Sequence, residues 1–84
     1  MNYVYAIWDS KNRKFYIGYT QNIDRRISEH KRGACHTTDR YAEKSLIYYE
    51  AFECEADARR RERYLKSSNG RKGLRLILRE SISR

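Results

Sequence analysis

Residues 15–30 read FYIGYTQNIDRRISEH, and the rest of the chain is arranged around this stretch. The run from Phe15 to Tyr19 is aromatic and β-branched, which favours a strand, and Gly18 fits a place where another group comes close to the backbone. Asn22 can cap a helix, because its side-chain oxygen can accept a hydrogen bond from a free amide of the first turn. Ile23 and Ile27 then repeat at helical spacing. The stretch therefore predicts a strand, a capped turn and a helix over about 23–31.

The predicted helix carries two polar residues on its apolar stripe. Arg26 and His30 complete the i, i+3, i+4, i+7 spacing that begins at Ile23, which places both on or beside the buried face. A helix without a further role would turn an arginine and a histidine to water. Both residues are therefore candidates for function.

Composition favours an anionic partner. Lys and Arg total 19 against 11 Asp and Glu, which gives a formal net charge of +8, so a nucleic acid is the first partner to consider. Eight tyrosines support this reading, because aromatic rings can stack on bases or pack beside the backbone. The alternative is a positively charged surface that serves only solubility.

Length and patterning predict one small domain over residues 1–84. There is no apolar run near the ~20 residues of a membrane span and no leader-like start, so we expect no membrane association and a cytoplasmic location. Cys35 and Cys54 are too few for a disulfide framework, and we expect reduced thiols.

The N-terminal residues predict a hairpin. Tyr3–Trp8 is a strand, Asp9–Arg13 is polar and turn-like, and the Phe15 strand follows. If Trp8 pairs with Arg13, the register sets Tyr5 opposite Tyr16 on one face, and the other face is shared by Val4, Ala6, Phe15 and Ile17.

The remaining segments complete an α+β domain. We expect the first helix to stop at Gly33, followed by a loop over Ala34–Lys44, a strand over Ser45–Phe52, a helix over Glu55–Ser67, a break at residues 68–70 and an amphipathic helix over Gly73–Ile82, whose apolar positions are Leu74, Ile77, Leu78 and Ile82. The order β-β-α-β-α-α predicts a small three-stranded antiparallel sheet flanked by helices.

The second predicted helix holds an unusual carboxylate. Ala58, Glu62 and Leu65 fall on one stripe (i, i+4, i+7). A carboxylate on an apolar stripe must be paired, protonated or bound to a metal, because a lone buried charge is costly. A structural ion pair with Arg26 or another arginine is one interpretation. A ligand for a hard cation such as Mg²⁺ is the other.

Taken together, these residues resemble the GIY-YIG nuclease superfamily over nearly the whole chain, and above all its small, single-domain bacterial proteins. Tyr3-Val4-Tyr5 stands in the place of GIY, without its glycine, and Tyr16-Ile17-Gly18 is an intact YIG. Arg26 lies ten residues after Tyr16, with His30 one turn later. The segments over 46–52 and 58–66 complete the match. Many relatives carry an asparagine after the glutamate helix, but Asn69-Gly70 is better interpreted as a helix-ending turn.

The resemblance implies hydrolysis of DNA phosphodiester bonds with one divalent ion, Mg²⁺ or Mn²⁺. Glu62 would hold the ion, and Arg26 would clamp a non-bridging phosphate oxygen. Tyr5 would be the general base, with Tyr16 beside it and His30 bonding a tyrosine or acting directly. A free tyrosine is a poor base at neutral pH, so nearby positive charge must favour the phenolate. Structure-selective cleavage in repair or recombination is one biological setting.

A further set of basic residues is expected to contact the DNA backbone: Arg25, Lys31, Arg40, Arg59, Arg63 and Lys66. Binding by one such domain would be weak and steeply dependent on salt. We expect a monomer rather than an oligomer.

Other interpretations are possible on the same residues. The scaffold could serve as a non-catalytic nucleic-acid-binding module, or as an adaptor that uses the helix over 74–82. His30, Cys35 and His36 could suggest zinc, but no fourth ligand stands at the usual spacing. Cys54 could suggest a nucleophile, but no histidine is near it in sequence.

Overall fold

The computed structural model of the chain describes residues 1–31 and 44–83. Within these ranges the elements follow in the order β1 (Asn2–Asp9), β2 (Lys14–Thr20), α1 (Ile23–Lys31), β3 (Lys44–Phe52), α2 (Glu55–Lys66), α3 (Ser68–Ile77) and α4 (Arg79–Ile82). The α+β class and the predicted order are confirmed. The last predicted helix is divided into α3 and α4.

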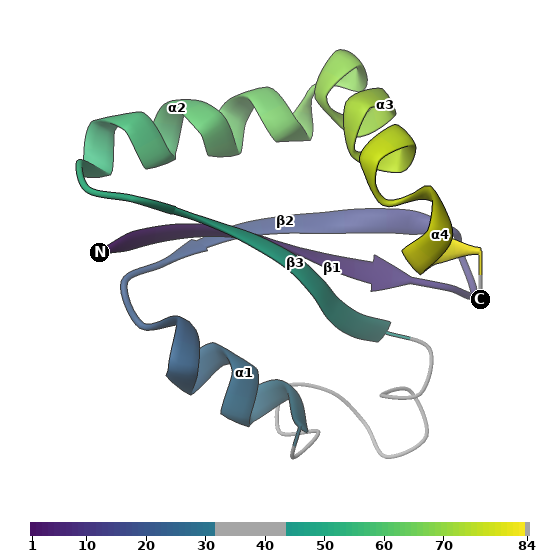
Figure 1. Ribbon diagram of the computed structural model, residues 1–84, viewed down its shortest axis with the longest axis horizontal. Helices are drawn as coiled ribbons and strands as arrows, with labels where there is room; N and C mark the ends of the chain where they lie inside the picture. The colour runs from purple at the N-terminus through teal and green to yellow at the C-terminus, as the bar shows by residue number, and fades with distance from the viewer. Residues whose placement is uncertain (32–43, 84) are drawn as a thin grey trace.

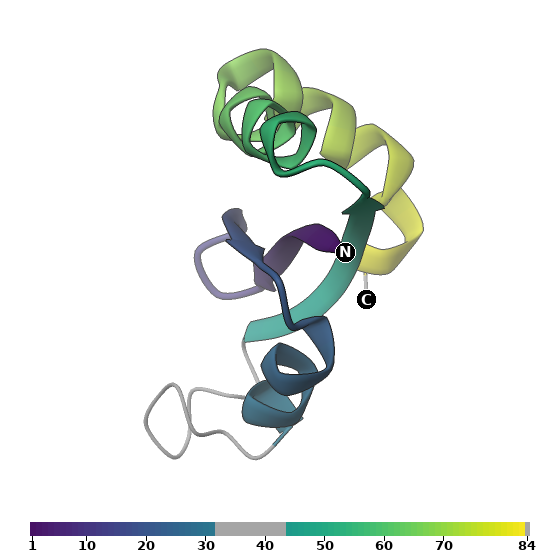
Figure 2. The same ribbon diagram turned by 90° about the vertical axis from the view of Figure 1, so that its left-hand side faces the viewer.

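The three strands form one antiparallel sheet in the order β2-β1-β3, so the N-terminal strand is central. Helices α2 and α3 lie on one side of the sheet and α1 lies on the other (Figure 1). Figure 2, which views the molecule from one end, shows the sheet between these two sets of helices. Strand β2 pairs only with β1 in the described part of the chain and is therefore an edge strand of the sheet.

The hairpin register differs from the expected one. Trp8 pairs with Phe15, and Tyr5 pairs with Gly18, so Tyr16 lies two residues away from the position opposite Tyr5. A shift of two residues preserves the alternation of faces. The two tyrosines therefore still share a face, although they are diagonal neighbours rather than a direct pair.

The turn between the strands explains this shift. The ladder continues to the pair Asp9–Lys14, and one carboxylate oxygen of Asp9 accepts hydrogen bonds from the amides of Lys11 and Asn12, both at 3.1 Å. Arg13 closes the turn in the left-handed region, with φ of 54°. Because Arg13 belongs to the turn, it is not available to pair with Trp8.

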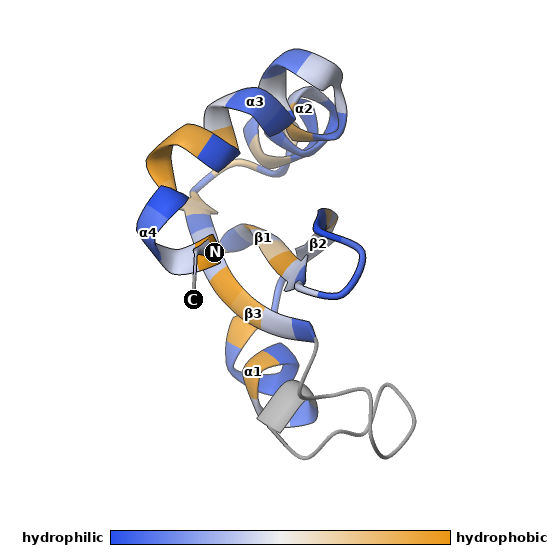
Figure 3. Ribbon diagram, turned by 90° about the vertical axis from the view of Figure 1, so that its right-hand side faces the viewer, coloured by the Kyte–Doolittle hydropathy of each residue, from blue (hydrophilic) through white to orange (hydrophobic). Residues whose placement is uncertain are grey.

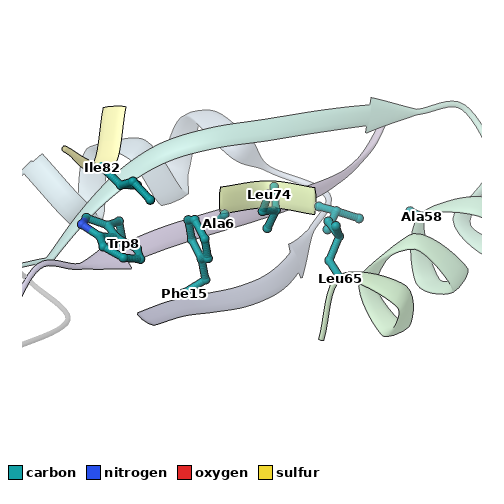
Figure 4. Close-up of a cluster of buried hydrophobic side chains, with 8 residues drawn as sticks. Ala6, Trp8, Phe15, Ala58, Leu65, Leu74 and Ile82 are labelled. Atoms are coloured by element: carbon teal, nitrogen blue, oxygen red, sulfur yellow. The ribbon is translucent and has the colours of Figure 1, made fainter. Parts of the chain in front are cut away.

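The core lies between the sheet and the helices on the α2 side. Buried side chains of the two faces pack together in one cluster: Val4, Ala6, Trp8 and Phe15 from the sheet, and Ala58, Leu65, Leu74 and Ile82 from the helices (Figure 4). The apolar segments of β1 and β3 lie between α1 and the α2–α3 pair (Figure 3). The expected sharing of one sheet face by Val4, Ala6, Phe15 and Ile17 is confirmed.

Helix boundaries are set by polar caps. Asn22 caps α1 as predicted, and its Oδ1 accepts a hydrogen bond from the Arg25 amide at 2.9 Å. Ser67 separates α2 from α3, because its amide donates to the Tyr64 carbonyl at 3.0 Å and its Oγ accepts from the Gly70 amide at 3.2 Å. One serine thus ends one helix and starts the next.

Two expectations for the C-terminal part were wrong. Residues 68–70 do not separate two helices, and Asn69-Gly70 is not a helix-ending turn. They belong to the first turn of α3, which starts at Ser68 after the Ser67 cap. Ile77, expected on the buried face, is 59% exposed. It is the last residue of α3, and Leu78 turns toward the core in its place. None of the described helices is long and apolar enough to cross a membrane.

Candidate active site

Tyr5 lies directly across Gly18 on the α1 side of the sheet. A Cβ placed on Gly18 would overlap the phenolic oxygen and Cζ of Tyr5. The ring can therefore extend over the β2 backbone only because residue 18 has no side chain. This packing explains why the intact YIG motif ends in glycine, and it brings the Tyr5 hydroxyl to the edge strand of the sheet.

Arg26 reaches the same place from α1. Its guanidinium carbon lies 5.6 Å from the centroid of the Tyr5 ring, and its Nη1 donates to Glu29 at 3.1 Å. The Arg26 Nε is buried and has no hydrogen-bond partner within the described residues. A buried donor without a partner is costly, and an anion beside Tyr5 would satisfy it. The sequence placed this arginine correctly on a half-buried stripe.

Tyr16 lies on the same face and is more open, with 40% of its surface exposed. Two ammonium groups flank its ring: the Nζ atoms of Lys14 and Lys44 each lie 5.3 Å from the ring centroid. Neither lysine was a predicted site residue. Lys14 could have been found from its i−2 spacing on the strand, but Lys44 is brought here only by the strand order.

Glu62 lies on the core-facing stripe of α2, as predicted. Its side chain is only 14% exposed, and its two oxygens accept from Arg59 at 3.3 Å and from Lys66 at 3.1 Å. The partner of Arg26 is Glu29, so the alternative of an Arg26–Glu62 pair is wrong and the alternative of a pair with another arginine is correct. Lys66 and Arg59, both predicted DNA contacts, thus have a partner in Glu62.

The Glu62 cluster is tied to the same part of β2 from the opposite face. The guanidinium carbon of Arg59 lies 3.7 Å from the centroid of the Tyr19 ring, and the Tyr19 hydroxyl donates to Asn2 at 2.6 Å. Tyr19 follows Gly18 in sequence, so its side chain points to the α2 side while Tyr5 crosses Gly18 on the α1 side. Strand β2 is therefore contacted by Tyr5 on one face and by Arg59, the partner of Glu62, on the other. The Arg59–Tyr19 contact was not predicted from the sequence.

The carboxylate fits a hard divalent ion as its single protein ligand. Each carboxylate oxygen has two lone pairs, and the bonds from Arg59 and Lys66 use one on each oxygen. Mg²⁺ typically takes one or two carboxylates and completes its shell with water and substrate phosphate. No group of three or more His, Cys, Asp or Glu side chains that could hold a metal occurs within residues 1–31 and 44–83. Glu62 is therefore the metal-ligand candidate in the described part of the chain.

A second polar network, not predicted from sequence, holds α2 on the sheet. Arg61 donates to both carboxylate oxygens of Glu50, from Nε at 2.9 Å and from Nη2 at 3.0 Å, and the Tyr48 hydroxyl donates to Glu50 at 2.6 Å. Burial and the bond to Glu50 raise the pKa of Tyr48 to about 12. Burial would also raise the pKa of Glu50, but the hydrogen bonds from Arg61 and Tyr48 outweigh it and lower that pKa. Arg61 precedes Glu62, so this pair fixes the rotation of the helix that carries the metal-ligand candidate.

The other predicted site residues are placed as follows. Arg25 is exposed and pairs with Glu29 at 3.1 Å, and Arg63 is exposed in the last turn of α2. The side chains of His30 and Lys31, and all of Arg40, Cys35 and His36, lie outside the described part of the structure.

Comparison with known proteins agrees with this geometry. The chain matches the family model described as the GIY-YIG catalytic domain over residues 1–75, a span that contains both tyrosines, Arg26 and Glu62. It is 40% identical to a UPF0213 protein of Clostridium perfringens, over 98% of this chain and 88% of that protein. It is 35% identical to one of Staphylococcus haemolyticus (90% and 93%) and 34% identical to one of Natronomonas pharaonis (95% and 94%). No solved structure matches.

The matched span covers both strands of the hairpin, α1, β3, α2 and most of α3. Every element that carries a residue of the candidate site therefore lies within it. The chain belongs to the GIY-YIG family of nuclease domains.

Proposed function

We propose that the protein, as a single domain over residues 1–84, is a divalent-metal-dependent endonuclease that hydrolyses DNA phosphodiester bonds. The observation that carries the proposal is the Tyr5 ring across Gly18 with the Arg26 guanidinium beside it. Among the described residues, the buried Nε of Arg26 has no hydrogen-bond partner there. A phosphate is the anion that a guanidinium matches best in geometry.

Each residue has a distinct task in this proposal. Arg26 donates to a non-bridging oxygen of the scissile phosphate and stabilises the charge that grows there. Tyr5, as phenolate, takes a proton from water while the water oxygen bonds to phosphorus and the bond to the leaving oxygen breaks. Tyr16 orients that water, and His30 hydrogen-bonds a tyrosine or acts directly.

Glu62 holds the divalent ion, Mg²⁺ or Mn²⁺, and the bound ion supplies positive charge that stabilises the phosphate and the leaving oxygen. Arg59 and Lys66 orient the Glu62 carboxylate through their hydrogen bonds. The DNA backbone is held by phosphate contacts from the basic set of Arg25, Lys31, Arg40, Arg59, Arg63 and Lys66. A monomer acting in the cytoplasm on repair or recombination intermediates is the setting we propose.

The test is cleavage of labelled duplex, flap, nicked and single-stranded DNA with Mg²⁺ or Mn²⁺. We expect metal-dependent products from the wild type, and a loss on the order of 10²–10³-fold in Glu62→Gln, as for other groups that stabilise transition-state charge. Glu80→Gln is the matched control, because the Glu80 side chain on α4 is 90% exposed. It should cleave like the wild type.

DNA binding separates this proposal from a non-catalytic binding module. That second reading is favoured by one observation, the pairing of Glu62 with Arg59 and Lys66, which would also suit a purely structural carboxylate. Glu62→Gln should still bind DNA as tightly as the wild type in an anisotropy titration. If the wild type binds but cuts none of the substrates with either metal, the binding module is the better account.

A further inference from the structure

Two lysines beside the candidate site form no ion pair within the described residues. Lys14 on β2 and Lys44 on β3 both lie 5.3 Å from the centroid of the Tyr16 ring, and neither forms an ion pair within residues 1–31 and 44–83. By contrast, Arg25, Arg26, Arg59, Arg60, Arg61 and Lys66 are all paired with carboxylates. Within the described residues, the positive charge beside Tyr16 is thus not matched by an equal number of carboxylates.

Among the described residues, the carboxylate that lies in register with these lysines offsets only part of their charge. Asp9 pairs in register with both Lys14 and Lys44, one on each side of the central strand. Its carboxylate, however, accepts hydrogen bonds from the turn: one oxygen from the amides of Lys11 and Asn12, and the other from the Asn12 side chain at 2.9 Å. Lys44 interacts electrostatically with Asp9, but one carboxylate cannot offset two ammonium groups, so net positive charge remains beside Tyr16 for an external anion.

We propose that Lys14 and Lys44, on either side of Tyr16, form a second phosphate subsite that binds a backbone phosphate next to the scissile one. Tyr16 lies two residues from Gly18 along β2, which is about 7 Å at the usual strand rise. A DNA strand that lies along β2 with one phosphate at Tyr5 and Arg26 would carry a neighbouring phosphate toward the lysines. The proposed nuclease function enters only to identify the ligand as DNA.

Each ammonium rests beside the Tyr16 ring, and such contacts hold a cation in place without neutralising it. A phosphate beside the ring, within reach of an ammonium group, would replace hydration by charge-assisted hydrogen bonds. Such contacts position the strand and carry no sequence preference.

The test is the salt dependence of DNA binding, measured by fluorescence anisotropy on a labelled duplex in the Glu62→Gln background so that the DNA stays intact. Loss of one phosphate contact should reduce the slope of log K against log salt by about 0.9. We expect that change for Lys14→Ala and for Lys44→Ala, and about twice that change for the double variant. Lys44→Arg should retain the wild-type slope, since it keeps the charge.

Lys72→Ala is the matched control, because Lys72 is exposed on α3, on the other side of the sheet. It should leave the slope unchanged. Equal losses in Lys72→Ala and in the two site variants would show a general charge effect and would overturn the subsite. Unchanged slopes in all three variants would overturn it as well.

A second measurement uses the substrate rather than the protein. A single methylphosphonate, which removes the charge of one phosphate, is moved along the cleaved strand. Cleavage by the wild type should fall at one position beside the scissile bond, and the double lysine variant should show no further loss there. If the protein cuts DNA but its salt slopes do not depend on the lysines, the nuclease proposal holds and the subsite proposal fails. If the protein never cuts DNA but its salt slopes depend on the lysines, the nuclease proposal fails and the phosphate subsite is retained.

Discussion

At the scale of single residues, Gly18 decides the position of Tyr5. The sequence predicted a close approach at this glycine and a shared face for the two tyrosines. It could not predict the register, because the extra ladder pair at Asp9 depends on how the turn satisfies that carboxylate. The resemblance assigned Tyr5 its role, and the structure supplies the physical reason for the glycine opposite it.

Gly18→Ala should therefore impair catalysis more than folding. The new methyl group would overlap the Tyr5 phenol, so the ring must move, and a displacement of about 1 Å in a reacting group can cost on the order of 10²-fold. We expect kcat/KM for DNA cleavage to fall by about that factor, with a loss of about 1–2 kcal/mol in the free energy of unfolding from overpacking. Cleavage kinetics and thermal melting check both numbers.

Gly73 provides the comparison for this substitution. A Cβ at Gly73 would contact nothing within 4 Å, and the residue lies inside α3, where alanine is the better helix former. Gly73→Ala should stabilise the protein by about 0.5–1 kcal/mol and leave cleavage unchanged. Equal activity in the two alanine variants would show that the Tyr5–Gly18 contact has no catalytic role.

At the scale of elements, the contacts that fix the position of α2 on the sheet could not be predicted from the sequence. Its acidic start, basic end and the inward position of Glu62 were predicted and are confirmed. The Glu50–Arg61 bond was not, because a strand residue and a helix residue with opposite charges have many possible partners until the sheet order is known. Likewise, Ser67 has the composition of an ordinary turn, and its role as a shared cap follows only from the close packing of α2 on α3.

Glu50→Gln should destabilise the protein at neutral pH. Hydrogen bonds to a charged group contribute about 1.5–3 kcal/mol, and partial exposure reduces this, so we expect a loss of about 1–2 kcal/mol in urea unfolding. Cleavage should fall too, because α2 carries Glu62. Glu53→Gln, at an exposed residue just after β3, is the control and should change neither quantity.

The same pair predicts a pH dependence. The folded state lowers the pKa of Glu50 below its ordinary 4.5, so the pair stabilises the fold fully above that value. This contribution is lost as pH falls through the lowered pKa of the folded state. Wild-type stability should thus decline below about pH 4.5, and the decline should be shallower in Glu50→Gln. Parallel acid-unfolding curves for the two proteins would contradict the role assigned to the pair.

At the scale of the whole molecule, the core is completed by a helix that lies beyond the residues matched by the family model. Ile82 on α4 is 7% exposed and lies beside Trp8 (Figure 4). Apolar spacing predicted the burial of Leu74 and Ile82 correctly, but it misplaced Ile77, since the helix that would have turned Ile77 inward ends there. The fold class follows from local patterns, whereas the end of the core depends on tertiary packing.

Ile82→Ala should lower the free energy of unfolding by about 2–4 kcal/mol, the usual cost of truncating a buried isoleucine. Trp8 is the only tryptophan in the chain, so its fluorescence should report the exposure of this end of the core as a shift to longer wavelength. Ile77→Ala removes the same atoms from an exposed position and should change stability by less than about 0.5 kcal/mol. Similar losses in both variants would contradict this account of the core.

The central place of β1 bears on how the protein forms during synthesis. Strand β1 pairs with two neighbours, and one of them, β3, is synthesised some forty residues later, since Tyr5 pairs with Tyr49. Until β3 emerges, the nascent chain can make only the β1–β2 hairpin, which is marginal alone. Such long-range pairing is slow to form. Translation that stops before β3 should therefore release fragments that have neither the complete sheet nor Glu62, the proposed metal ligand.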